Sequence, residues 1–207
     1  MDEDAPNGSV RLVLASRSPR RVQLLEQLGL TFEALPADVD ERYAAGEEAG
    51  AHAERLAREK AAAVAVHAPD ALVIGSDTVV DVDGLVLGKP RGKGEAVEML
   101  LRLQGRTHEV ATGVAVVGNG GTWSGVERVR VAFRTFDRDL AEAYVATGEP
   151  LDKAGAYGIQ GYGAALVERI EGDYFAVMGL PLARLLGLLQ AAGFRYNFRA
   201  LTKEGSG

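Results

Sequence analysis

The sequence contains no cysteine, and its three histidines are isolated from one another. Without cysteine the chain can form no disulfide and offers no thiolate to a metal. The positions of His52, His67 and His108 match none of the spacings of a zinc site. A Gly-x-Ser-x-Gly nucleophile elbow is also missing, which argues against a serine nucleophile. Carboxylates and lysines are therefore the remaining candidates for catalysis.

Long apolar runs and an excess of positive charge are missing as well. No run approaches the length that crosses a bilayer, and the first residues show no basic segment followed by an apolar one. Lys and Arg number 23 against 29 Asp and Glu, a net charge of −6, which disfavours broad binding to nucleic-acid polymers. We expect a cytoplasmic enzyme or binding protein with neither a membrane nor a nucleic-acid polymer as partner.

The length of 207 residues fits one α/β domain over 1–207, or one domain with two lobes. Such a chain can bury a substantial core without disulfides or structural metals. Residues 1–8 and 203–207 are polar or small and are expected to be loose termini. No internal repeat or linker divides the sequence.

Residues 10–29 show the clearest local pattern. Residues 10–15 are mostly apolar and β-prone, as is typical of a buried strand. Ser18 suits a helix N-cap and Pro19 suits the first helical position. Apolar residues then recur at helical spacing until Gly29, which can end a helix in the left-handed conformation. The segment therefore predicts a strand, a tight turn and a helix.

Two arginines, Arg20 and Arg21, lie in the first turn of that predicted helix. The helix dipole is positive there, so two cations raise the electrostatic energy unless an anion is also bound. Free backbone N–H groups, the hydroxyls of Ser16 and Ser18 and two guanidinium groups would suit a phosphate chain. The alternative is two solvated arginines on a surface helix.

Helices and strands alternate through the next part of the chain. Strands are predicted at 30–35, 71–74 and 79–82, and helices at 49–67, 94–104 and 139–147. Asp139 and Glu142 have the spacing of a capping box. Hairpins are predicted at Asp83-Gly84, at 118–121, and between 164–170 and 174–178, before a last helix opened by Leu180-Pro181. The pattern favours an α/β fold with a mixed sheet.

Asp77 and Lys60 are the candidates with reactive side chains. Asp77 follows a buried apolar strand beside glycine and serine, where α/β sheets place ligand sites, although a lone Asp there can also be a turn residue. Lys60 shares the apolar stripe of its helix with Leu56 and Val64. It either extends along the surface by its aliphatic stem or reaches into a cleft.

Five stretches in order resemble the Maf family of nucleoside-triphosphate pyrophosphatases. They are LASRSPRR (14–21), AREKA (57–61), SDTVV (76–80), GKP (88–90) and DKAGAYGIQG (152–161). GDY at 172–174 and GLP at 179–181 match as well, so the similarity covers nearly all of 12–189. It implies an elongated α/β fold of the inosine-triphosphatase type, with two lobes around a cleft.

The same resemblance implies a set of site residues. Asp77 matches the family's proton acceptor, and Glu41 with Asp77 would hold a divalent metal, Mg²⁺ or Mn²⁺. Substrate contacts are implied for Ser16, Arg20, Arg21, Lys60, Thr78, Lys89 and Gln160. Of these, Arg20, Thr78 and Gln160 match the subgroup that prefers dTTP and UTP. Arg17 fills a position that varies in the family, and Gly88 stands where some members carry Glu.

The implied activity is hydrolysis of dTTP and UTP, or of modified pyrimidine nucleotides, to the monophosphate and pyrophosphate. One alternative is a nucleotide-binding regulator of septum formation with little turnover. Another is the same fold with a different base preference, such as modified guanine or cytosine nucleotides. A homodimer is compatible with each, and the sequence alone does not separate a housecleaning role from control of division.

Overall fold

The structure, a computed structural model, describes residues 10–118 and 120–204. A seven-stranded mixed sheet lies at its centre, with strand order β2-β1-β3-β5-β6-β7 and with β4 beside β3. Its strands are β1 (Arg11–Leu14), β2 (Glu33–Ala34), β3 (Ala71–Val82), β4 (Leu85–Leu87), β5 (Thr107–Gly118), β6 (Gly121–Phe133) and β7 (Val167–Glu171). Strand β1 pairs parallel with β2 and β3, and the other pairs are antiparallel. The predicted mixed α/β sheet is confirmed.

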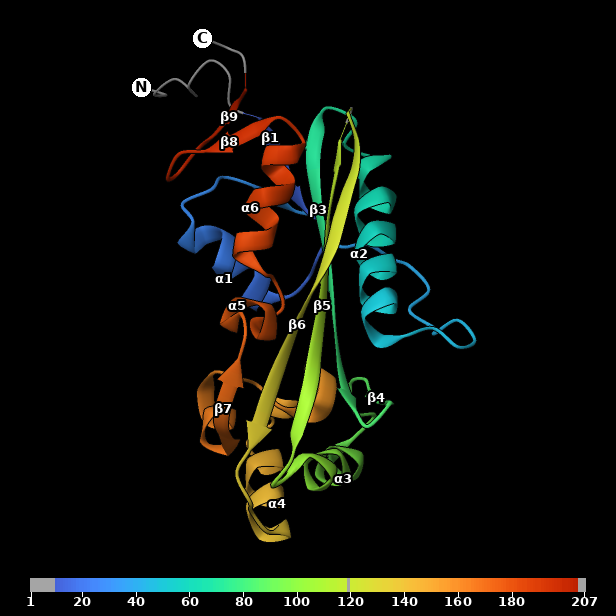
Figure 1. The fold of residues 1–207 in the computed structure, drawn as a ribbon, viewed down its shortest axis with the longest axis vertical. Helices are drawn as coiled ribbons and strands as arrows, with labels where there is room; N and C mark the ends of the chain where they lie inside the picture. The colour runs from blue at the N-terminus through green and yellow to red at the C-terminus, as the bar shows by residue number, and fades with distance from the viewer. Residues whose placement is uncertain (1–9, 119, 205–207) are drawn as a thin grey trace.

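Helices cover both faces of this sheet. They are α1 (Pro19–Gln27), α2 (Ala49–Ala65), α3 (Lys93–Leu103), α4 (Arg138–Ala146), α5 (Tyr174–Met178) and α6 (Leu182–Ala191). Figure 1 shows α2 on one side of the long strands, α1 and α6 on the other, and α3 with α4 at the far end. A small hairpin of β8 (Phe194–Tyr196) and β9 (Leu201–Lys203) packs near α6. No helix in the described ranges is both long and apolar enough to span a membrane.

Two large clusters of buried apolar side chains lie along the elongated sheet. One includes Leu100 and Phe133 near α3 and α4, and the other includes Leu14 and Leu185 near α1 and α6. Strand β3 belongs to both, because its first half contributes Ile74 and its second half Val80 and Val82. The strand runs unbroken through Gly75 and Ser76, so the two predicted strands at 71–74 and 79–82 are one. These clusters form the cores of the two predicted lobes.

Helix α2 packs very closely on β3 and β5 through two glycines. A Cβ added to Gly75 would lie 2.8 Å from the backbone nitrogen of Ala61, and one added to Gly113 would overlap the carbonyl of Ala53. The facing helix residues Ala53, Ala57 and Ala61 are fully buried. This close approach brings Lys60, on the same helix, to the middle of β3.

We expect Gly113→Ala to lower the free energy of unfolding by about 1–3 kcal/mol, because overpacking displaces backbone atoms that cannot move away cheaply. Urea unfolding measures the change. Gly187→Ala in α6 is the matched control, because Gly187 is exposed with nothing within 4 Å of its added Cβ. The control should be stabilising, since alanine is favoured over glycine in a helix interior. Equal effects at both sites would contradict the close-packing argument.

The predicted hairpin between 164–170 and 174–178 is wrong. Strand β7 (Val167–Glu171) pairs with β6 instead, and residues 174–178 form the short helix α5. The Asp173 side chain accepts from Phe175 N at 2.8 Å to cap α5, and Gly179 ends it with a φ of 110°. A short apolar run does not by itself distinguish a strand from a buried helix. The capping residues on either side carried the missing information.

Smaller differences concern the ends of elements. Helix α4 begins at Arg138 and is capped by Asp137, whose carboxylate accepts from Leu140 N at 2.9 Å, so the predicted capping box at Asp139 is wrong. The predicted strand at 30–35 is reduced to Glu33–Ala34. At the termini, Lys203 belongs to β9, whereas 1–8 and 205–207 lie outside the described residues, as does Asn119 in the predicted turn at 118–121.

Candidate active site

A cleft of about 600 Å³ opens between the two core clusters. That volume is typical of a site for a small organic ligand. Its lining comes from the turn after β1, the loop between β2 and α2, helix α2, strand β3, the turn after β4 and the segment 152–159. Apart from Gln160, all eight residues that the sequence implies for substrate, metal or catalysis line this cleft: Ser16, Arg20, Arg21, Glu41, Lys60, Asp77, Thr78 and Lys89.

The turn between β1 and α1 is organised by Ser16. Its Oγ accepts from the backbone N–H of Ser18 at 3.1 Å and from Arg21 Nη1 at 3.2 Å. Ser18 occupies the N-cap position, as the sequence predicts, but its side chain forms no capping hydrogen bond. The Ser18 side chain therefore leaves the backbone N–H groups in the first turn of α1 uncapped.

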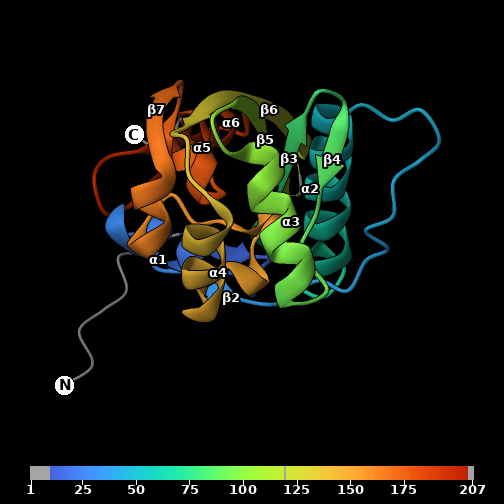
Figure 2. The same cartoon turned by 90° about the horizontal axis from the view of Figure 1, so that it is seen from below.

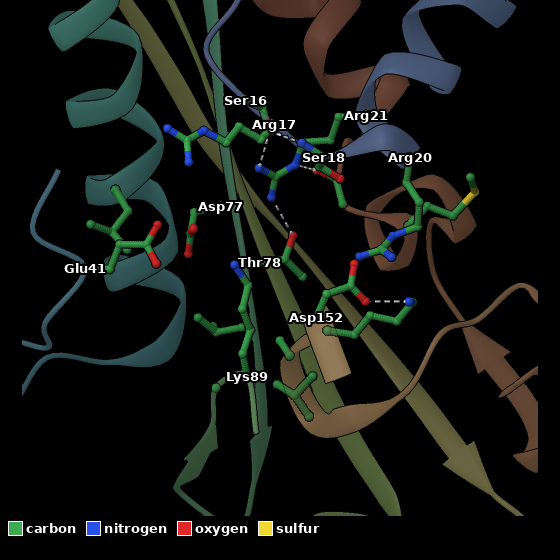
Figure 3. Close-up of a pocket in the computed structure, with 18 of the residues that line it drawn as sticks. Ser16, Arg17, Ser18, Arg20, Arg21, Glu41, Asp77, Thr78, Lys89 and Asp152 are labelled. Carbon is green, nitrogen blue, oxygen red and sulfur yellow. Dashed lines mark hydrogen bonds and ion pairs between the residues drawn. The ribbon is translucent and has the colours of Figure 1, made fainter. Parts of the chain in front are cut away.

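Arg21 is held at the centre of the cleft by several contacts. Its Nε donates to the Gly179 carbonyl at 2.7 Å, and its Nη2 lies 3.4 Å from Thr78 Oγ1. Burial lowers the pKa of Arg21, and the negative charge of Asp77 opposes that shift. An arginine nevertheless stays protonated in proteins. Figure 3 shows Arg21 and Thr78 between Asp77 on one side and Arg20 on the other.

Lys60 joins the two acidic residues of the cleft. Its Nζ lies 2.6 Å from Asp77 Oδ1 and 2.6 Å from Glu41 Oε1. Lys60 is only 9% exposed, so its ammonium group reaches into the cleft instead of extending into solvent. Partial burial would raise the pKa of Glu41, but the hydrogen bond from Lys60 and the charges of Lys60, Lys89 and Arg21 outweigh it and hold that pKa below its ordinary value.

Asp77 lies within a strand, not at the end of one. It stands in the middle of β3 and pairs with Gly113 of β5. Only 13% of its side chain is exposed. The sequence suggested a strand end because Gly75 and Ser76 interrupt the apolar run, yet Gly75 is there to admit α2. The mid-strand position makes Asp77 a poor candidate for a turn residue.

Glu41 is carried by the loop between β2 and α2, which is tied back to α2. Arg55 Nε donates to Glu47 Oε1 at 2.7 Å, and Arg55 Nη2 donates to the Arg42 carbonyl at 3.1 Å. The hydrogen bond from Arg55 holds the pKa of Glu47 well below its usual range. Figure 2 shows this light-blue loop extending from the body of the molecule. Its anchoring at Arg42 and Glu47 is what places Glu41 opposite Asp77.

The remaining predicted substrate residues differ in how they are held. Lys89 is exposed and has no hydrogen bond or ion pair with any described residue. Arg20 is half-buried and lies with Asp152 across the cleft from Asp77 (Figure 3). Gln160 is not among the residues that line the cleft, although its neighbours Gly158 and Ile159 are. Its contact with a base stays a prediction.

Comparisons with known proteins match residues 11–192 to the family described as Maf-like protein. The chain belongs to the Maf family. A relative from Moorella thermoacetica is 55% identical over 185 residues, 88% of this chain and 95% of that protein. One from Methylobacillus flagellatus is 49% identical over 185 residues, covering 88% and 93%. Both relatives are named dTTP/UTP pyrophosphatase.

The lining of this cleft also includes residues that were not selected from the sequence, among them Arg17, Tyr43 and Asp152. Tyr43 stacks on His52 with ring centroids 3.5 Å apart and 5° between the planes. Asp152 could have been found, because it begins the family stretch 152–161 and is followed by a lysine. Arg17 and Tyr43 lie in irregular segments, where no periodic pattern indicates which way a side chain points.

The donor set of this Maf cleft fits a metal that is shared with a substrate. Within the described ranges, no group of three or more His, Cys, Asp or Glu residues could hold an ion by themselves. Glu41 and Asp77 nevertheless offer hard carboxylate oxygens on either side of Lys60. Mg²⁺ is commonly held by one or two carboxylates, with phosphate and water oxygens completing its shell. The residues present therefore fit the expected metal, provided that a phosphate chain also binds.

Proposed function

We propose that this Maf protein hydrolyses dTTP and UTP at the α–β phosphoanhydride bond, releasing the nucleoside monophosphate and pyrophosphate. The observation that carries the proposal is the Lys60 ammonium between Asp77 and Glu41, in a cleft that Arg21 and Lys89 also line. Such a cluster of opposite charges is typical of phosphoryl transfer, where positioning and electrostatic stabilisation dominate. The names of the relatives support the choice of substrates.

The charges of the cleft suit a triphosphate. A triphosphate chain carries about four negative charges near neutral pH, because the last ionisation of a phosphate has a low pKa. Arg20, Arg21, Lys60 and Lys89 are four of the cationic residues that line the cleft. Cations focused in a cleft can attract an anionic ligand even when the whole protein is net negative.

In the proposed mechanism Asp77 is the general base. It accepts a proton from the attacking water as the new phosphorus–oxygen bond forms and the α–β bridge breaks, with pyrophosphate as the leaving group. Lys60 keeps Asp77 in place through the 2.6 Å contact, and Arg21 and Lys89 bind phosphate oxygens. Mg²⁺ or Mn²⁺ held by Glu41 and Asp77 would offset negative charge on the phosphoryl oxygens.

Pyrophosphate release from a panel of nucleoside triphosphates tests this function. We expect steady turnover of dTTP and UTP, weak turnover of CTP, and loss of turnover in EDTA that Mg²⁺ or Mn²⁺ restores. Binding without steady pyrophosphate release would support the alternative of a nucleotide-binding regulator instead. Faster release from modified guanine or cytosine nucleotides would overturn the base preference while keeping the chemistry.

Gln160→Ala tests the predicted side-chain contact with the base. Uracil and thymine present an O4 acceptor beside an N3–H donor, and one glutamine amide can satisfy both. Cytosine reverses both positions. We expect the ratio of UTP to CTP catalytic efficiencies to fall about tenfold or more, as when a polar contact to a substrate group is lost. An unchanged ratio in a folded variant would leave Gln160 as a structural turn residue.

A further inference from the structure

The glycine-rich segment 158–163 is held by two side chains from outside it. Tyr144 Oη accepts from the backbone N–H of Gly158 at 3.0 Å and donates to Glu149 Oε1 at 2.8 Å. Glu149 accepts from the backbone N–H of Gly163 at 3.0 Å and of Tyr162 at 2.9 Å. We call the pair Tyr144 and Glu149 the loop anchor. It joins both ends of the segment to helix α4 and to the turn that follows it.

The glycines of the segment make room for the loop anchor. Gly161 has a φ of +65°, and a Cβ there would lie 3.0 Å from Glu149 Cδ. A Cβ on Gly163 would lie 2.6 Å from Tyr144 Oη. The loop anchor therefore explains these glycines. Gly161 and Gly163 lie against the side chains of Glu149 and Tyr144, and larger residues at these positions would displace those side chains.

Every side-chain oxygen of the loop anchor takes part in a hydrogen bond. Burial raises the pKa of Tyr144, so its hydroxyl keeps the proton that it donates to Glu149. Burial would also raise the pKa of Glu149, but the hydrogen bonds from Tyr162, Gly163 and Tyr144 outweigh it and lower that pKa. A fully satisfied network of this kind fixes one geometry, whereas a partly satisfied one is costly.

The anchored segment contributes residues with unpaired backbone groups to one end of the cleft. Gly158 and Ile159 line the cleft, and Ile159 is only 7% exposed. Within the described chain, neither the N–H nor the C=O of Ile159 has a hydrogen-bond partner. Backbone groups of buried residues are normally paired, so the unpaired groups of Ile159 are candidates for contact with a ligand. A peptide N–H beside a C=O matches the O4 acceptor and N3–H donor of uracil and thymine, so this backbone is the alternative to the Gln160 amide as the partner of those two base atoms.

This end of the cleft also suits a base better than phosphates. Asp152 lines it, across the cleft from Asp77 (Figure 3). Asp152 pairs with Lys153 at 2.7 Å, so these two charges offset each other, whereas Lys60, Arg21 and Lys89 line the part of the cleft near Asp77. The phosphates therefore belong near Lys60 and the base near Asp152.

We propose that Tyr144 and Glu149 are positioning residues for base selection. They fix the backbone of 158–160 as an edge that accepts uracil or thymine and disfavours cytosine, and neither touches the reacting atoms. The proposal rests on the proposed pyrophosphatase function, and it identifies the residues that determine the preference for uracil and thymine over cytosine.

Tyr144→Phe tests the proposal, because it removes the one oxygen that bridges Gly158 and Glu149. Without this oxygen the Gly158 N–H loses its hydrogen-bond partner, so the backbone of 158–160 is held less firmly. We therefore expect the UTP-to-CTP ratio of kcat/KM to fall about fivefold or more. KM for UTP should rise, while kcat for UTP stays within about twofold because Asp77, Lys60 and Glu41 are untouched. A merely structural role would lower the melting temperature and leave the ratio unchanged.

Tyr196→Phe is the matched control. Its hydroxyl donates to the Leu28 carbonyl at 2.7 Å, and neither residue lines the cleft, so the same chemical change should leave the ratio unaltered. Glu149→Gln is the second variant, and it should lower the ratio in the same direction if Tyr144→Phe does not fold. An unchanged ratio in whichever of the two variants folds overturns the proposal. Wild-type turnover of UTP is measured in parallel, so a failure of the pyrophosphatase function would be seen separately.

Discussion

Asp77→Asn should abolish pyrophosphate release while the protein stays folded and still binds nucleotide. Loss of a general base typically lowers the rate by about 10²–10⁴-fold. The asparagine has the same shape, and Lys60 keeps its 2.6 Å contact with Glu41, so the buried ammonium is not left unpaired. Binding should survive, because the neutral amide also removes repulsion between Asp77 and the phosphates.

The Asp77→Asn measurement needs three parts. Steady-state pyrophosphate release from UTP gives the rate, nucleotide titration monitored by calorimetry gives binding, and thermal unfolding shows that the fold is intact. Asp70→Asn is the matched control, since Asp70 is exposed and does not line the cleft. If Asp77→Asn kept more than half of wild-type turnover, Asp77 could not be the base.

Much of the charged cluster in the cleft could be predicted from the sequence because several of its members lie on regular elements. The helical spacing of Leu56, Lys60 and Val64 put Lys60 on the inward face of α2, and it is buried there. The strand–turn–helix pattern of 10–29 likewise placed Arg20 and Arg21 at the start of α1. The family resemblance then selected Asp77 and Glu41, which periodicity alone could not have paired.

What the sequence could not predict depends on contacts between distant segments. The link between Lys60 and Asp77 needs α2 to approach β3 closely at Gly75, and a glycine in a strand equally suggests a break. Helix α5 was missed because a run of five residues carries no reliable period, and its capping residues decided the outcome. The loop anchor joins residue 144 to residue 158 and could be found only from the folded chain.

Lys89→Ala and Arg21→Ala should weaken all triphosphates by similar factors. Both residues line the cleft, and phosphate contacts carry no information about the base. Truncating one partner of a desolvated charge pair costs about 2–5 kcal/mol, whereas a solvated surface cation would cost under about 1 kcal/mol. The measurement is kcat/KM for both UTP and dTTP, expressed as a free-energy difference for each variant.

Lys89→Ala and Arg21→Ala should differ in their effect on the stability of the fold. Lys89 has no hydrogen bond or ion pair with any described residue, so its loss should leave the free energy of unfolding unaltered and act only through substrate. Arg21 also holds the Gly179 carbonyl at 2.7 Å, so Arg21→Ala should lower stability as well as activity. Arg21→Lys keeps the charge but loses the planar fork of donors, which separates the two effects.

Arg91→Ala is the control for Lys89→Ala. Arg91 lies two residues away, does not line the main cleft, and pairs with Glu95 at 3.1 Å on the surface. If kcat/KM falls less than threefold in Arg91→Ala but much more in Lys89→Ala, the effect depends on the position of Lys89 in the cleft. A large loss at Lys89 for one base only would contradict the phosphate assignment, because a cation that contacts only phosphate oxygens has no means of distinguishing uracil from thymine. The similarity of the two losses, more than their size, is therefore the decisive result.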